Sequence, residues 1–196
     1  MVTGAAAAVL AGGDGTRMGG VSKAFLEVEG RPIIARQLEL LRALFAEVFV
    51  VANDPAPFAG LGIHVVADLL PGRGAPGGVH AAVASARAPW VFCLACDMPF
   101  ASAAPIELLA ARRGTARAVA PLVGDRPEPL FSFYSKRCVE LFARLLAEGS
   151  PSLIRLLLAV EPELVLEAEF ARADPTGRAL ENLNTPRDLA RAQAGR

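Results

Sequence analysis

Cysteine, histidine and surplus charge are all scarce in this 196-residue chain. Its three cysteines cannot all pair, which argues against a disulfide-stapled secreted scaffold. Lys and Arg together number 20 and are balanced by 20 Asp and Glu. A general nucleic-acid-binding protein normally carries a basic surplus, so we expect no nucleic-acid partner. A local cationic pocket for one phosphate ligand is still compatible with this balance.

Long apolar runs are also missing. The longest, Ala5–Ala11, is far shorter than the ~20 residues that span a bilayer. The first residues lack the basic leader and cleavage site of a signal peptide. We therefore expect a cytoplasmic protein that has no membrane partner and begins with a buried strand.

One pair of cysteines has the spacing of a redox or zinc motif. Cys93 and Cys96 form C-x-x-C, but they lie in Trp90–Cys96, which has the composition of a buried strand. Alternation along a strand would point the two thiols to opposite faces. No second cysteine pair follows, and His64 and His80 are scattered. We expect the cysteines to belong to the core.

The pattern that is present is that of an α/β protein. Short apolar runs alternate with helical patterns, and 196 residues can bury roughly 70% of the unfolded surface in one core. The turn-rich interval 124–129 predicts a hairpin and hence one antiparallel strand in an otherwise parallel sheet. The expected strands are Ala5–Leu10, Val48–Ala52, Ile63–Ala67, Val91–Ala95, Ala118–Leu122, Leu130–Tyr134 and Leu164–Leu166. The expected helices are 33–45, Gly77–Arg87, Ala104–Arg113, Lys136–Leu146, Ser152–Leu158 and Pro186–Gln193. We predict a single three-layer domain over residues 1–196.

A glycine-rich loop follows the first strand, over Leu10–Lys23. Glycines let backbone N–H groups approach a phosphate, and open α/β sheets bind ligands at the carboxyl ends of their strands. Its glycines are spaced one residue too far for a dinucleotide fingerprint, and Asn53 stands where that fold needs an acid. A P-loop fails too, because Val21 and Ser22 follow Gly20. The two separated cations that remain, Arg17 and Lys23, could hold a triphosphate.

Polar residues follow three other expected strands. Asp97 comes after Val91–Ala95 and could hold Mg²⁺, whose preferred ligands are oxygens. Asp68 and Asn53 stand at the ends of the two strands between. An asparagine amide both donates and accepts, so Asn53 could bind a base edge, although a turn residue is an equally good interpretation.

Three segments together resemble one known family. The loop Leu10–Lys23 with its doubled glycine, the C-D-x-P at 96–99 and the N-x-N-T-P at 182–186 occur in the same order in molybdenum cofactor guanylyltransferases, which belong to the sugar-phosphate and cytidylyl nucleotidyltransferases. The resemblance implies a Rossmann-like nucleotidyltransferase fold, a mostly parallel sheet, and transfer of GMP from GTP to the terminal phosphate of molybdopterin with release of pyrophosphate.

The same resemblance implies roles for individual residues. Arg17, Lys23 and Asp97 would be catalytic, with Asp97 carrying Mg²⁺, and Asn182 and Asn184 would bind the acceptor. The residues implied to contact the nucleotide are Leu10, Ala11, Gly12, Gly13, Lys23, Asn53, Asp68 and Asp97. The family also implies a protein partner that delivers molybdopterin or receives the product, and a monomer or weak homo-oligomer.

The chain departs from the family at two places that would border the acceptor. Glu128 stands where Gln or His is expected before Pro-Leu, and Ser150–Pro151 stands where a basic residue is frequent. Two alternatives therefore stay open: a cytidylyltransferase acting on the same pterin or on a small alcohol phosphate, and a non-catalytic GTP-binding chaperone for a molybdoenzyme.

Overall fold

The computed structural model describes residues 1–12 and 22–193. An eight-stranded sheet forms its centre, in the order β10-β7-β9-β6-β1-β4-β5, with β8 beside β7. No helix in the described ranges is long and apolar enough to cross a membrane. The strands of the sheet are β1 Ala5–Leu10, β4 Val48–Val51, β5 His64–Val66, β6 Trp90–Ala95, β7 Ala118–Val123, β8 Arg126–Pro127, β9 Phe131–Ser135 and β10 Glu163–Leu166.

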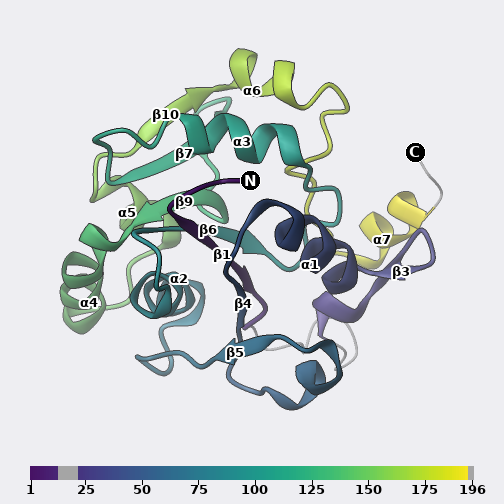
Figure 1. Ribbon diagram of the computed structural model, residues 1–196, viewed down its shortest axis with the longest axis horizontal. Helices are drawn as coiled ribbons and strands as arrows, with labels where there is room; N and C mark the ends of the chain where they lie inside the picture. Colours follow the sequence, from purple (N-terminus) through teal and green to yellow (C-terminus); the bar gives the residue numbers. More distant parts are fainter. Residues whose placement is uncertain (13–21, 194–196) are drawn as a thin grey trace.

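Helices cover both faces of this sheet, which gives the three layers expected from the sequence (Figure 1). One face packs against α1 Ile33–Leu44, α3 Ala103–Ala111 and α6 Glu167–Ala173. The other packs against α2 Gly74–Ser85, α4 Val139–Glu148 and α5 Leu153–Leu158. Outside the layers, α7 Pro186–Gln193 lies beside the hairpin of β2 Glu27–Val28 and β3 Arg31–Pro32.

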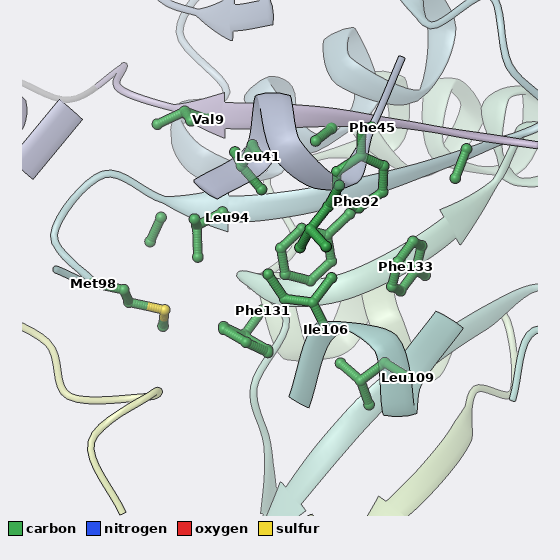
Figure 2. Packing of buried hydrophobic residues seen from close by; sticks show 14 of the residues in the cluster. Val9, Leu41, Phe45, Phe92, Leu94, Met98, Ile106, Leu109, Phe131 and Phe133 are labelled. Atoms are coloured by element: carbon green, nitrogen blue, oxygen red, sulfur yellow. The ribbon is translucent and has the colours of Figure 1, made fainter. Parts of the chain in front are cut away.

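The core follows from the alternation of side chains along strands that are buried on both faces. In β1, Ala7 and Val9 face one helix layer, and Ala6 and Ala8 face the other. The first layer contains the aromatic cluster in Figure 2, where the rings of Phe92 and Phe131 meet edge to face with centroids 5.1 Å apart.

The predicted antiparallel strand is confirmed. β9 runs antiparallel to both β6 and β7, while β1 is parallel to β4 and β6. The sequence did not predict the two-residue β8, which adds a short antiparallel pair with β7. It also missed α6 and the β2–β3 hairpin, because segments this short carry too little periodicity to be recognised.

Two further predictions can be compared with the structure. Cys93 in β6 and Cys138 are buried, as expected of core cysteines, and burial raises the pKa of the Cys93 thiol far above its usual range. Cys96 is only half-buried, because β6 ends at Ala95 and Cys96 lies in the turn that follows. The helix expected over Gly77–Arg87 begins earlier, at Gly74. Its first turns contain Gly74, Gly77 and Gly78, and glycine disfavours a helix by about 1 kcal/mol per residue, which concealed the true start.

Candidate nucleotide-binding and acceptor site

The site lies where β4, β5 and β6 end. Asn53, Asp68 and Asp97 each follow the last residue of their strand by two positions. Because these strands are parallel, their carboxyl ends share one edge of the sheet, which brings together residues far apart in the chain.

Lys23 joins three segments at this edge. It begins the 3₁₀ helix Lys23–Phe25, and its Nζ lies 2.8 Å from Oδ2 of Asp97. The same ammonium donates a hydrogen bond of 2.7 Å to Oδ1 of Asn184. The Lys23 and Asp97 side chains are 25% and 16% exposed, so water screens this pair less than a fully exposed one. The segment that begins at Lys23, the end of β6 and the C-terminal segment thus meet at one cation.

The C-terminal segment is fixed to the turn that carries Asp97. The Leu183 N–H donates to the Asp97 carbonyl at 2.9 Å. The Leu183 side chain is buried in a small cluster with Val28, Ile33 and Ala192. This anchoring places Asn182 and Asn184 on either side of a buried residue, close to the end of β6.

Thr185 and Asp188 cap the start of the last helix. Asp188 N–H donates to the Thr185 hydroxyl at 3.2 Å, and Oδ2 of Asp188 accepts from the Asn184 and Thr185 amides. This reciprocal capping satisfies the end of the helix. It leaves the Asn184 side chain for Lys23.

Asn53 and Asp68 are joined by two hydrogen bonds. Nδ2 of Asn53 donates to Oδ2 of Asp68 at 3.3 Å, and the Asp68 N–H donates to Oδ1 of Asn53 at 3.0 Å. Asn53 is exposed and Asp68 half-buried. The pair presents amide and carboxylate groups that could accept and donate to the polar edges of a nucleoside.

Gly78 completes this side of the site, and the sequence did not single it out. A Cβ added at Gly78 would lie 3.2 Å from Cδ2 of Leu10 and 3.8 Å from Oδ1 of Asp68. The α2 backbone therefore passes directly beside the end of β1 and the Asp68 carboxylate. The paired glycines 77–78 inside a helix were the available signal, since glycine there usually marks a close approach.

Some main-chain groups at the start of the glycine loop are hydrogen-bonded to the sheet. The Leu10 carbonyl accepts from the Cys96 N–H at 3.1 Å, and the Ala11 N–H donates to the Val51 carbonyl at 2.9 Å. The first main-chain groups beyond these bonds are the Ala11 carbonyl and the Gly12 amide. Two expected site residues, Gly13 and Arg17, lie outside the described residues.

A cavity of about 710 Å³ opens next to Asn182 and Asn184. Arg126 in β8 and Glu128 directly after it form part of its wall, and Ser152 at the start of α5 forms another part. We call it the acceptor-side cavity. Glu128, one of the two departures from the family, therefore lines the same cavity as the two asparagines, and Ser150–Pro151, the other, directly precedes Ser152.

Glu128 is an acidic residue in the wall of this cavity. It is half-buried, and its Oε1 accepts a 2.9 Å hydrogen bond from the Leu130 N–H. Burial raises the pKa of the Glu128 carboxyl, and the negative charge of Asp97 raises it further. The Leu130 N–H and the positive charge of Arg126 oppose this shift.

The donor set suits a metal that arrives with its substrate. No three His, Cys, Asp or Glu side chains converge anywhere in residues 1–12 and 22–193. Mg²⁺ is commonly held by one or two carboxylates together with substrate phosphates and water. Asp97, a half-buried carboxylate at a strand end, fits this arrangement.

Comparisons with known proteins agree with this geometry. A family model described as a MobA-like NTP transferase domain matches residues 7–163. A molybdenum cofactor guanylyltransferase from Desulfosudis oleivorans is 31% identical over 187 residues, covering 95% of this chain and 93% of the relative. One from Pseudomonas aeruginosa is 37% identical over 188 residues, covering 93% and 91%. The crystal structure of molybdopterin-guanine dinucleotide biosynthesis protein A from Archaeoglobus fulgidus matches with a TM-score of 0.83 and 26% identity, covering 96% of both chains.

Proposed function

This chain belongs to the MobA-like NTP transferase family, and on that premise we propose that it transfers GMP from GTP to the terminal phosphate of molybdopterin. The curated relatives that are named molybdenum cofactor guanylyltransferases span almost the whole chain. The observation that carries the proposal is the position of Lys23, whose ammonium contacts both Asp97 and Asn184. It stands between the nucleotide side of the site and the acceptor-side cavity.

The nucleotide would lie across the carboxyl ends of β1, β4 and β5. Asn53, Asp68 and the glycine face of α2 would contact the nucleoside, together with the Leu10 side chain and the main chain from Ala11 through Gly13. Lys23 would hold the phosphates, and Arg17 would stand beside the pyrophosphate that leaves. A phosphate can join Asp97 and Asn184 as a third partner of the Lys23 ammonium, because that group has three donors and these two contacts use two of them.

Asp97 would hold Mg²⁺ together with oxygens of the nucleotide. When bound, the ion offsets charge on the phosphates and so lowers the repulsion between nucleotide and acceptor. The chain's own contribution is to keep the Asp97 carboxylate in place at the end of β6. Lys23 neutralises that carboxylate before the nucleotide arrives.

Asn182 and Asn184 would bind molybdopterin in the acceptor-side cavity, with Glu128 at its wall. An oxygen of the acceptor phosphate attacks the α-phosphorus of GTP and forms a new P–O bond. The bond between the α-phosphorus and the bridging oxygen breaks, and pyrophosphate leaves with that electron pair. The acceptor is already anionic, so no protein nucleophile is needed, and catalysis consists of positioning and charge neutralisation.

A nucleotide-binding measurement tests the proposal. A ligand present at about 100 times its dissociation constant adds roughly 2.7 kcal/mol to stability, so the melting temperature should rise with GTP and Mg²⁺. Release of pyrophosphate should then require GTP, Mg²⁺ and molybdopterin together. A shift selective for CTP would make the protein a cytidylyltransferase. Binding of GTP without turnover would favour the non-catalytic chaperone.

The setting of the reaction is also a proposal. Molybdopterin is the acceptor that the relatives' names imply, and a protein partner would deliver it or receive the product. We propose a cytoplasmic monomer or weak homo-oligomer. Size-exclusion chromatography with light scattering, with and without GTP, measures the oligomeric state.

A further inference from the structure

Gln37 is a polar residue within an apolar layer. It lies in the middle of α1 and is only 1% exposed. Its neighbours along the same helix, Ile34, Leu38 and Leu41, pack into the core between α1 and the sheet, and Figure 2 shows Leu41 pointing into that layer. Burying an amide costs free energy unless it is hydrogen-bonded, so the partners of Gln37 indicate what the residue does.

Both partners are carbonyl groups that bracket Asp97. Nε2 of Gln37 donates to the Ala95 carbonyl at 2.8 Å and to the Met98 carbonyl at 3.0 Å. Ala95 is the last residue of β6, and Met98 directly follows Asp97. Two acceptors fix the orientation of the amide, because the side-chain oxygen would be repelled in the same place.

These bonds connect a rigid helix to the turn that bears Asp97. On the other side, the Asp97 carbonyl accepts from Leu183, and the Cys96 N–H donates to Leu10. The main chain of the turn is therefore held from three directions. Gln37 is the one side chain among these contacts. A substitution can therefore remove its two hydrogen bonds and leave the main-chain hydrogen bonds to Leu10 and Leu183 in place.

We propose that Gln37 is a positioning residue for Asp97. Its amide holds the Ala95–Met98 turn so that the carboxylate meets the Mg²⁺–nucleotide complex without first having to be ordered. This inference rests on the proposed function, since it concerns the residue that would hold the metal. Residues that orient a metal ligand from outside its contacts typically change metal affinity or activity by about 10- to 100-fold when they are replaced.

Gln37→Met tests the proposal, because methionine has a similar length and fills the site but cannot donate. Calorimetry would give the GTP dissociation constant with Mg²⁺ and again with EDTA, in the absence of acceptor. The ratio of the two constants isolates the contribution of the metal. We expect Gln37→Met to reduce this ratio about tenfold, leave binding in EDTA unchanged, and speed hydrogen exchange of residues 94–100 relative to β1.

Leu41→Ala is the matched control. Leu41 lies one turn along α1 and is fully buried, so its truncation destabilises the same layer and leaves the Gln37 amide in place. It should keep the wild-type ratio even where its melting temperature falls further than that of Gln37→Met. Both variants are measured below the onset of unfolding as seen by circular dichroism.

Asp97→Asn separates failure of this inference from failure of the proposed function. If Asp97→Asn abolishes the metal effect and Gln37→Met leaves it intact, Gln37 only fills the core and the inference is wrong. If Asp97→Asn also keeps the effect, the metal assignment fails. Exchange of residues 94–100 then decides whether Gln37 orders the turn: unchanged exchange overturns the inference.

Discussion

The ion pair between Lys23 and Asp97 is the chemical centre of the site. A lysine and a carboxylate 2.8 Å apart at partial burial attract each other more strongly than an exposed pair, and the pair brings opposite charges to where phosphates and a metal would bind. Asn184 adds a neutral acceptor to the same ammonium. Removing the lysine therefore takes a positive charge from the phosphates and leaves a half-buried carboxylate without its partner.

Replacing Lys23 with methionine should lower kcat/KM for GTP on the order of 100-fold, comparable to loss of one preorganised electrostatic contact in an active site. Steady-state release of pyrophosphate at saturating molybdopterin measures the effect.

Lys136→Met is the control for the loss of charge alone. Lys136 is exposed and follows Ser135, which pairs with Trp90 at the amino end of β6, the opposite edge of the sheet from Asp97. Activity should stay within twofold of the native enzyme. A comparable loss in both variants would show that Lys23 acts only through the total charge of the protein.

Helix α2 contributes its backbone to the site, because Gly77 and Gly78 have no side chains. A side chain at Gly77 would crowd Arg73, and one at Gly78 would crowd Leu10, so both positions hold glycine although each glycine disfavours the helix. The entry into the helix needs glycine for a second reason: Gly72, in the turn before α2, and Gly74, its first residue, adopt positive φ angles of 77° and 58°, which residues with a side chain rarely reach. The element is therefore built to bring its backbone close to the ends of β1 and β5.

Gly78→Ala should weaken GTP binding on the order of tenfold, because the new methyl would displace the Leu10 side chain by a few tenths of an ångström and lie against the Asp68 carboxylate. The better helix propensity of alanine offsets the crowding, so the melting temperature without ligand should change little. Calorimetric titration and a thermal melt measure the two quantities. Ser85→Ala, at the far end of α2, should alter neither; unchanged binding in Gly78→Ala would mean that this face does not contact the nucleotide.

The whole molecule combines two large apolar layers with one small cluster around Leu183. The small cluster attaches the C-terminal segment and α7 to the β2–β3 hairpin, and a 3.0 Å hydrogen bond from Gln193 to the Glu27 carbonyl supports it. The acceptor-side cavity is a product of this arrangement, because its walls come from β8 and the residues on either side of it, from the start of α5 and from the C-terminal segment. The half-buried carboxylate of Glu128, in the wall of this cavity, affects the stability of the whole fold.

Glu128→Gln should stabilise the protein at neutral pH, since glutamine preserves the acceptor for Leu130 and removes a charge that burial disfavours. The pKa of Glu128 is raised in the folded state, so its contribution to stability is complete below the pKa of the unfolded chain and is lost as the pH rises through the folded value. The gain in the free energy of unfolding should therefore be largest at pH 7–8 and shrink toward pH 4. Urea unfolding across that range measures it.

The same variant tests whether Glu128 has a role in the reaction. Glutamine is one of the two residues that the family resemblance leads us to expect at this position, and the change removes a negative charge from the wall of a cavity proposed to bind an anionic acceptor. Glu128→Gln should therefore lower KM for molybdopterin and leave KM for GTP unchanged. If Glu128→Gln and the native protein have the same free energy of unfolding at both pH 7.5 and pH 4.5, then burying the charge of Glu128 does not destabilise the fold and this explanation is wrong.

The sequence by itself determined the order of strands and helices, the parallel character of the sheet and its antiparallel β9. Continuous apolar runs such as β1 and β6 are long enough to be recognised as strands. The hairpin signal at 124–129 is also local, because all of its turn residues lie within one short stretch of sequence. It also identified Lys23, Asn53, Asp68, Asp97 and Asn184 as candidates, because each stands in a local motif or directly after a strand. Their assignment to nucleotide, metal and acceptor remains a prediction.

Only the tertiary structure decided which of these residues meet. Lys23 and Asn184 are 161 positions apart, and no local pattern encodes their contact. Gln37 resembles any polar residue of an amphipathic helix until α1 is packed on the sheet, where its amide meets the carbonyls on either side of Asp97. The importance of Glu128 and Gly78 likewise follows from their neighbours in the folded chain: Glu128 lines a cavity, and Gly78 lies beside Leu10 and Asp68. Local propensity and periodicity act over a few residues, whereas a site at a sheet edge is assembled by strand order and helix packing, which bring distant parts of the chain together.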